Sequence, residues 1–171
     1  RELILQLNQL GADALIVQDL GMARMIRALA PDLPIHASTQ LTVHNIGGVL
    51  QAHRLGFSRV VLSRELPLEE IAFICKNSPV EIEVFVHGAL CMCYSGQCYL
   101  SAAIGGRSGN RGLCAQPCRM AYSFPGEGME HPLSLKDLSL AEHLFQLEQA
   151  GVHTLKIEGR MKRPEYTALV T

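Results

Sequence analysis

The densest group of chemically reactive side chains in this sequence is a run of cysteines between residues 83 and 122. Five of the six cysteines lie in this cysteine segment: Cys91, Cys93, Cys98, Cys114 and Cys118. The segment also holds six of the fifteen glycines, and no Asp or Glu occurs between Val84 and Gly126, whereas three arginines do: Arg107, Arg111 and Arg119. Clustered thiols in a flexible segment whose charged side chains are all positive from Val84 onward favour a ligand that is soft and anionic.

The spacing of the cysteines narrows the choice of ligand. No Cys-x2-Cys pair occurs, so zinc-ribbon and thioredoxin motifs match poorly. Cys114-x3-Cys118 would begin a radical-SAM triplet, but its third position holds Ala121. Four thiolates from two loop segments suit a [4Fe–4S] cluster, whose ligands can be widely spaced, and zinc is the alternative metal. Cys75, alone on an apolar helical face, is instead expected in the core.

Alternating strand and helix patterns surround the cysteine segment. Apolar runs predict six strands, over residues 12–19, 35–41, 59–66, 81–88, 132–138 and 152–160. Helical spacing predicts helices over residues 1–10, 22–29, 45–55 and 139–150, with others that begin at Pro67 and Pro164. A strand roughly every 25 residues indicates right-handed βαβ units and a parallel sheet.

Polar side chains recur where the predicted strands end: Asp19, Gln40, Arg64, Glu65, His87, Asp137 and Glu158. A TIM-type barrel places its chemistry at that rim. We therefore predict an α/β fold, a parallel (β/α)8 TIM-type barrel, as one incomplete domain over residues 1–171. About six βα units are present, the first two are expected to be missing, and a Cys-rich loop insertion covers about residues 88–131. An open doubly wound sheet is the alternative, and an exposed strand edge at residues 12–19 predicts association of the truncated chain.

The composition limits the classes of protein to which this chain can belong. A chain of 171 residues with 48% hydrophobic and 18% charged residues is typical of a globular domain. The formal charge of −1 argues against a protein that coats nucleic acid, although a local basic patch is compatible with it. No apolar run approaches the ~20 residues that span a bilayer, and no secretory start is present. Six cysteines without such a start indicate a reducing compartment, so we expect a cytoplasmic protein with no membrane partner.

Several rim residues are candidates for binding or proton transfer. The cations could pair with a dicarboxylate or a phosphate: Arg64, Lys156, Arg160 and Lys162. Glu158 and Glu65 could transfer protons. His87, four residues before Cys91, could act beside a cluster or as a catalytic base, and His36 is a weaker candidate. The alternative for each charged residue is a salt bridge that closes the rim.

Four stretches of the sequence resemble blocks of peptidase family U32, the collagenase-like peptidases. They are EVFVHGALC at 83–91, GQCYLS at 96–101, NRGLCAQPCR at 110–119 and LKIEGRMK at 155–162, and the resemblance runs from about Asp13 onward. It implies a catalytic region similar to a (β/α)8 barrel, in agreement with the strand pattern. It also implies that Cys91, Cys98, Cys114 and Cys118 are the cluster ligands, with Cys93 as a neighbour.

The same resemblance implies the function. Some members of the family are reported to degrade collagen, and others are iron–sulfur proteins that hydroxylate tRNA, rRNA or ubiquinone precursors without oxygen, with prephenate as donor. We therefore expect a [4Fe–4S]-dependent hydroxylase of tRNA or rRNA pyrimidines, with Arg119 and Arg160 balancing the charge of cluster and dicarboxylate donor. A collagenase-like peptidase is the alternative, although no His-Glu-x-x-His or Gly-x-Ser-x-Gly motif occurs. A zinc-stabilised binding module is the third possibility.

Overall fold

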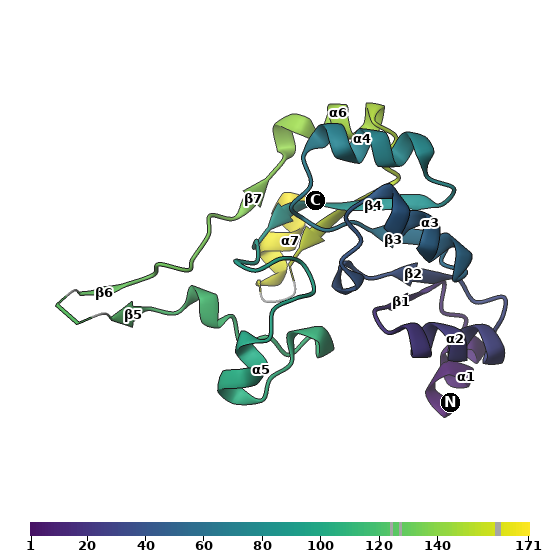
Figure 1. Cartoon of the computed structure of the whole chain (residues 1–171), viewed down its shortest axis with the longest axis horizontal. Helices are drawn as coiled ribbons and strands as arrows, with labels where there is room; N and C mark the ends of the chain where they lie inside the picture. The colour runs from purple at the N-terminus through teal and green to yellow at the C-terminus, as the bar shows by residue number, and fades with distance from the viewer. Residues whose placement is uncertain (124, 127, 160–161) are drawn as a thin grey trace.

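A parallel sheet forms the centre of the molecule. The computed structural model describes residues 1–123, 125–126, 128–159 and 162–171. Within them five strands run parallel: β1 (Leu15–Val17), β2 (Ile35–Ala37), β3 (Arg59–Val61), β4 (Glu81–Gly88) and β8 (Thr154–Glu158). β1 to β4 pair in chain order, and β8 pairs with β4. The sheet curls into a half-barrel (Figure 1).

Helices connect the strands and cover the sheet. Their bounds are α1 (Glu2–Gln9), α2 (Leu20–Leu29), α3 (Ile46–Arg54), α4 (Leu68–Asn77), α6 (Leu144–Gln149) and α7 (Pro164–Val170). Side-chain caps start two of them: Asp19 accepts a hydrogen bond from the Met22 amide at 2.7 Å, and Asn45 accepts one from the Gly48 amide at 2.8 Å. Such caps satisfy amides that have no partner within the helix, and so fix where each helix begins.

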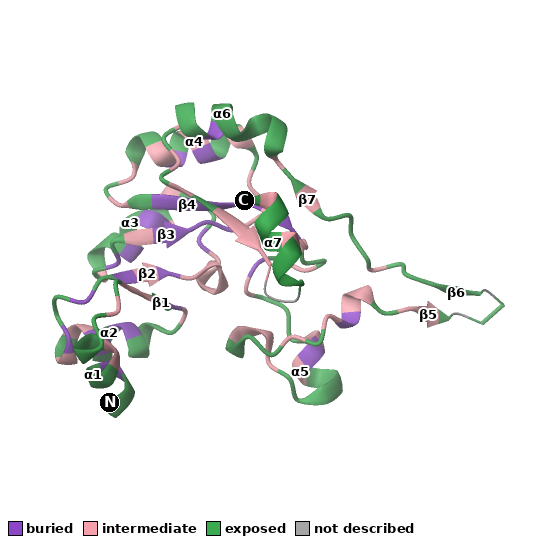
Figure 2. Cartoon of the chain, turned by 180° about the vertical axis from the view of Figure 1, so that it is seen from behind, coloured by how far each residue is buried: buried purple, intermediate pink, exposed green. Residues whose placement is uncertain are grey.

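The core lies between the sheet and these helices. Ile35 and Ile82 of the strands are fully buried, as are Val49 of α3 and Ile74 of α4. In Figure 2 the buried residues follow the strands and the inner sides of the helices. Five consecutive residues of β4 are buried, as expected for a parallel strand that is covered on both faces.

The cysteine segment begins within β4 and leaves the sheet after Gly88. It contains α5 (Leu100–Gly105), and it leads into an antiparallel pair, β5 (Tyr122–Ser123) and β6 (Met129–Glu130). This pair projects away from the half-barrel and is largely exposed (Figures 1 and 2). The chain then pairs with β4 again through β7 (Leu138–Ser139), which runs antiparallel to it.

Two sequence predictions near β7 are wrong. The strand expected over residues 132–138 is a turn and irregular chain that ends in the short antiparallel β7. The helix expected over residues 139–150 is shortened to α6, because Ser139 pairs with His87 and the Leu140 amide donates to the Val86 carbonyl at 2.9 Å. Extended pairing at the edge of β4 thus replaces the first helical turn, and the described residues contain five parallel strands rather than six.

One edge of the sheet is exposed. Within the described part of the chain β1 pairs with β2 alone, and Ile16 at its centre is 57% exposed. Across the same residues no helix combines the length and the apolar character that a membrane span requires.

Candidate functional site

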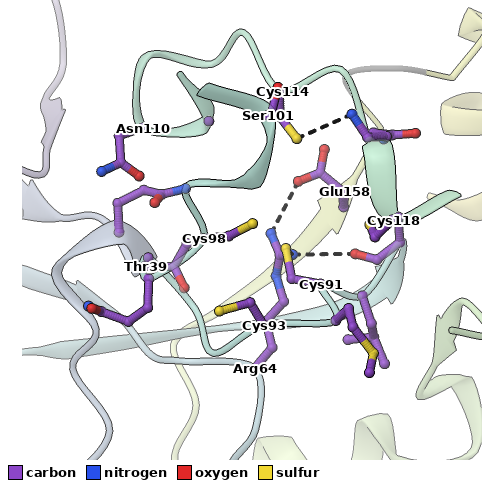
Figure 3. A pocket seen from close by; sticks show the side chains of 18 of the residues that line it. Thr39, Arg64, Cys91, Cys93, Cys98, Ser101, Asn110, Cys114, Cys118 and Glu158 are labelled. Atoms are coloured by element: carbon purple, nitrogen blue, oxygen red, sulfur yellow. Dashed lines mark hydrogen bonds and ion pairs between the residues drawn. The ribbon is translucent and has the colours of Figure 1, made fainter. Parts of the chain in front are cut away.

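A cavity of about 1010 Å³ opens at the carboxyl ends of the parallel strands. Its walls come from the residues that follow β1, β2, β3 and β4, from the end of β8, and from the cysteine segment. All five cysteines of that segment line it, and Figure 3 shows them around Arg64 and Glu158. The cavity therefore lies at the strand ends, where the sequence predicted the polar residues to meet.

Gly88 allows the chain to turn from β4 into the cavity wall. Its φ is 111°, a left-handed conformation that side chains other than that of glycine rarely adopt. A Cβ built at Gly88 would lie 2.5 Å from the main-chain oxygen of Glu158, so only glycine lets β4 and β8 approach this closely. The close approach brings Glu158 beside the start of the cysteine segment.

Ser95 fastens the cysteine segment to the strand ends. It is 4% exposed, and its carbonyl accepts a hydrogen bond from Thr42 Oγ1 at 2.8 Å. Its hydroxyl accepts one from the Arg64 amide at 3.2 Å, and its amide donates to the Glu65 carboxylate. Thr42, Arg64 and Glu65 thus hold one loop in place. This loop carries Cys91 and Cys93 before Ser95 and Cys98 after it.

Two of the thiols accept hydrogen bonds from the protein. Arg64 Nη1 lies 3.4 Å from Cys91 Sγ, and the Gln116 amide lies 3.3 Å from Cys114 Sγ. Gln116 has a φ of 55°, so a strained residue directs this amide back to the sulfur. Donors of this kind stabilise thiolates and tune the metals that thiolates bind.

The Arg64 side chain occupies the centre of the cavity wall. Its guanidinium carbon lies 4.1 Å from the centre of the Phe85 ring, and Nη2 lies 3.3 Å from Glu158 Oε2. Nη1 also reaches the Ala89 carbonyl at 3.3 Å, and the side chain is only 12% exposed. Arg64 therefore connects a thiol to a carboxylate across a partly desolvated wall.

The other predicted cations of the wall also have carboxylate partners. Lys156 Nζ lies 2.6 Å from Oε1 of Glu83, which is buried. Arg119 lies 3.4 Å from Asp137 and also donates to the carbonyls of Leu90 and Leu135. Each of these cations would therefore have to exchange a partner in order to bind a substrate anion.

The surroundings of Cys91 oppose its ionisation, although the open cavity leaves the residue exposed. Partial desolvation is the largest cause and raises its pKa; Arg64 lowers the pKa, and the neighbouring thiols of Cys118, Cys114 and Cys98 raise it. The other three thiols therefore act electrostatically on Cys91. A cationic ligand shared between them would relieve this repulsion, with release of protons.

Some of the predicted site residues lie elsewhere. His87 does not line the cavity; its ring lies 5.7 Å from that of Tyr166. Glu65 lines a smaller neighbouring pocket of about 160 Å³ together with Arg64 and Cys91. Lys162 pairs with Asp137 at 3.1 Å. Arg160 lies outside the described residues.

The structure adds cavity residues to which the sequence analysis gave no individual role: Gln18, Tyr94, Tyr99, Asn110 and Arg111. Gln18 donates to the Asn110 carbonyl at 2.6 Å, which joins the end of β1 to a turn that lies 92 residues later in the chain. Gln18 stands immediately before the strand-end residue Asp19, and Arg111 belongs to the acid-free window. These two signals could have identified them, but no sequence pattern reveals the contact itself.

Several known proteins are similar to this chain in sequence. The model of a family described as "Peptidase family U32" matches residues 1–171. The chain is 42% identical to 23S rRNA 5-hydroxycytidine C2501 synthase of Escherichia coli, over 100% of this chain and 27% of that protein. It is 37% identical to tRNA hydroxylation protein P of Escherichia coli, over 94% of this chain and 47% of the relative.

A relative with a different name is also similar. The collagenase of Porphyromonas gingivalis is 38% identical, over 92% of this chain and 42% of that protein. The chain thus spans less than half the length of each of these three relatives. A solved structure, that of the U32 peptidase Mk0906, superposes with a TM-score of 0.58 at 17% identity, over 95% of this chain and 61% of that one. That similarity supports the fold, a half-barrel consistent with part of a TIM-type barrel.

Proposed function

This chain belongs to peptidase family U32, and from that membership we propose that it holds the [4Fe–4S] cluster of an oxygen-independent hydroxylase of tRNA or rRNA pyrimidines. One observation carries the proposal. Cys91, Cys98, Cys114 and Cys118, the cysteines of the family-like motifs, line one cavity at the strand ends. The relatives named for rRNA and tRNA hydroxylation support RNA as substrate. We place the protein in the cytoplasm, whose reducing conditions keep thiols available for iron.

The lining of the cavity fits an iron–sulfur cluster. Among the described residues that line it, four side chains are cationic and one is a carboxylate: Arg64, Arg111, Arg119, Lys156 and Glu158. A cluster with four thiolates is anionic, so this balance favours it.

The overall reaction exchanges a C–H bond of the base for a C–OH bond. Replacing C–H by C–OH removes two electrons from the base, and a donor that gives up its hydroxyl in return for hydrogen accepts them. We propose a hydroxylated dicarboxylate such as prephenate as this donor. When bound, the cluster would supply one-electron transfer.

We propose that Arg64 and Glu158 handle charge and protons in this reaction. A donor carboxylate can replace Glu158 on the Arg64 guanidinium, which already faces the cavity and contacts Cys91. Glu158 is then positioned to take up the proton that leaves the base. Lys156 remains paired with Glu83, and so contributes positive charge to the wall rather than a direct contact.

The test is anaerobic turnover. The protein purified without air is incubated with unmodified tRNA and with an rRNA fragment, with and without prephenate, and the nucleosides are analysed by mass spectrometry. We expect a pyrimidine to gain one oxygen only when donor and iron are both present. Arg64→Gln should raise the donor concentration required by roughly tenfold to a hundredfold, the range for loss of a charge-assisted hydrogen bond. Arg54→Gln, on the exposed surface of α3, is the matched control.

The collagenase-like peptidase is the second candidate, because one relative carries that name. A thiol protease needs a Cys of lowered pKa beside a His. Here Cys91 contacts Arg64, its pKa is raised, and His87 does not line the cavity. The described residues therefore favour the hydroxylase. Cleavage of a collagen peptide by iron-free protein, with no base modified under any condition, would reverse that preference.

A further inference from the structure

Two exposed tyrosines line the cavity. Tyr94 is 73% exposed and Tyr99 is 67% exposed, and both belong to the cysteine segment. Exposed aromatic rings around a cavity are typical of ligand-binding surfaces. In proteins that bind single-stranded nucleic acid, such rings serve as platforms on which unpaired bases stack.

Two uncharged side-chain amides line the same cavity without a hydrogen-bond partner among the described residues. The side chains of Gln40 and Asn110 make no hydrogen bond within the described part of the protein, and both are half-buried in the wall. Figure 3 shows Asn110 across the cavity from Cys118. A side-chain amide offers both a donor and an acceptor, which matches the mixed donor and acceptor edge of a pyrimidine.

Among the described cations of the cavity wall, Arg111 lacks a carboxylate partner. Arg111 lines the cavity on the turn Gly109–Arg111, directly after Asn110, and its side chain is in no ion pair or hydrogen bond with the residues that the structure describes. Arg64, Arg119 and Lys156 each have a carboxylate partner. Arg111 is therefore available to pair with an incoming phosphate without giving up another contact.

From these three observations we propose that the residues form a subsite for one unpaired pyrimidine nucleotide of RNA. The base stacks on Tyr94 or Tyr99, Gln40 and Asn110 bond to its edge, and Arg111 pairs with its phosphate. The hydrogen bond from Gln18 to the Asn110 carbonyl holds the turn in place. A base inside a duplex cannot enter such a cavity, so the nucleotide is single-stranded or flipped out. This inference rests on the proposed function and identifies where its substrate base lies.

The test measures binding without turnover. Fluorescence anisotropy of labelled oligouridylate and oligocytidylate is recorded with the anaerobic protein and no donor. Tyr94→Leu and Tyr99→Leu should each weaken binding, and replacing the tyrosine that stacks on the base should weaken it by roughly tenfold or more. Tyr94→Phe and Tyr99→Phe should bind like the wild type, because phenylalanine keeps the aromatic ring. Asn110→Leu should weaken binding severalfold. Arg111→Gln should weaken it and lower the slope of log K against log salt by about one, whereas Arg54→Gln, outside the cavity, leaves the slope unchanged.

The outcomes separate this inference from the hydroxylase proposal. If the variants lose RNA binding as described but no base is ever hydroxylated, the subsite stands and the reaction is wrong. If hydroxylation proceeds and both tyrosine variants bind and turn over like the wild type, the subsite is wrong and the reaction stands. Tyrosine-dependent binding of a proline-rich peptide, with no binding of RNA, overturns the subsite. Arg111 is exposed and has no side-chain partner among the described residues, so the salt slope of the Arg111→Gln variant stays informative even if a tyrosine variant folds poorly.

Discussion

Individual cysteines in the cavity differ in their surroundings. Cys91 and Cys114 accept hydrogen bonds, and Cys118, Cys114 and Cys98 each act on the pKa of Cys91. Figure 3 shows the Cys93 sulfur apart from those of Cys114 and Cys118. Cys93 also lines the cavity but lies outside the fixed positions of the family-like motif, so we assign it as a neighbour of the four proposed ligands.

Serine replacements should make that separation. We predict that Cys91→Ser, Cys98→Ser, Cys114→Ser and Cys118→Ser each lose most of the bound iron, because a hard hydroxyl is a poor substitute for a soft thiolate. Cys93→Ser and Cys75→Ser should retain it. Iron and sulfide per chain are measured after anaerobic purification. Loss of iron in Cys93→Ser together with retention in Cys118→Ser would show that the ligand set is misassigned.

Cys75 differs from these cysteines, because it lies outside the cavity and is half-buried. It packs against the core from α4, and burial raises its pKa to about 11 from an ordinary 9.0. The folded state therefore keeps the proton that the unfolded state loses above about pH 9. The stabilisation is fully present below that pH and disappears as the pH rises towards 11.

A pH series can detect this effect. We predict that the advantage of the wild type over Cys75→Ala in free energy of unfolding shrinks by up to roughly 2–3 kcal/mol between pH 8 and pH 11, at about 1.4 kcal/mol per pKa unit. Urea unfolding at four pH values measures it. An advantage that stays constant across the series would mean that Cys75 ionises as readily in the folded protein as in the unfolded chain.

The sequence identified the charged residues and the thiols of the site, but it did not reveal which of them are in contact. The rim residues Arg64, Lys156 and Glu158 could be found because they end apolar runs, and all three line the cavity. The pairing of Arg64 with Cys91 and Glu158 spans 27 and 94 residues of sequence, and such distances leave no local pattern. Tyr94, Tyr99 and Asn110 of the subsite were missed because Tyr and Asn in loops are common and carry no distinctive spacing, whereas Gln40 and Arg111 were noted but given no binding role.

Among the elements, the junction of β4 and β8 controls the geometry of the cavity. Gly88 is the residue that permits it, since a side chain there would meet the Glu158 carbonyl and adopt an unfavourable φ. We predict that Gly88→Ala destabilises the fold by about 2–4 kcal/mol, from strain and steric overlap together. Gly105→Ala is the control, because a Cβ at Gly105 has open space around it.

Thermal unfolding of the two variants makes the comparison. Gly105→Ala should be neutral or slightly stabilising, since alanine favours a helix by roughly 0.5–1 kcal/mol over glycine. Equal midpoints for both variants would contradict the account of the junction. Iron retention adds a second readout, because Gly88 leads directly into the loop that carries Cys91.

Elements with strong periodicity were predictable, and those formed by tertiary pairing were not. The strand Glu81–Gly88 matches the sequence prediction, because its long apolar run has flanking turn signals. The predicted strand 35–41 ends at Ala37 instead, since Ser38 caps a short 3₁₀ turn, Thr39–Leu41. β7 could not be predicted from local sequence, because its two residues are extended only through pairing with β4.

At the scale of the whole molecule, the exposed edge of β1 is the feature that favours association with other chains. Its backbone has no strand neighbour on one side within the described residues, and an unpaired, partly apolar edge is a template for another chain. We predict concentration-dependent association of this chain through that edge. Sedimentation velocity should show dimers or larger species whose share falls in Ile16→Lys. A clean monomer at all concentrations would contradict this prediction.

The central claim is that the half-barrel and its cysteine segment hold an iron–sulfur cluster, and the metal content of the protein purified without air tests it most directly. The account predicts a broad absorption band near about 400 nm that bleaches on exposure to air, with about four iron and four sulfide per chain. Preparations that contain one zinc per chain, or no metal, and that show no such band after anaerobic reconstitution with iron and sulfide would contradict it.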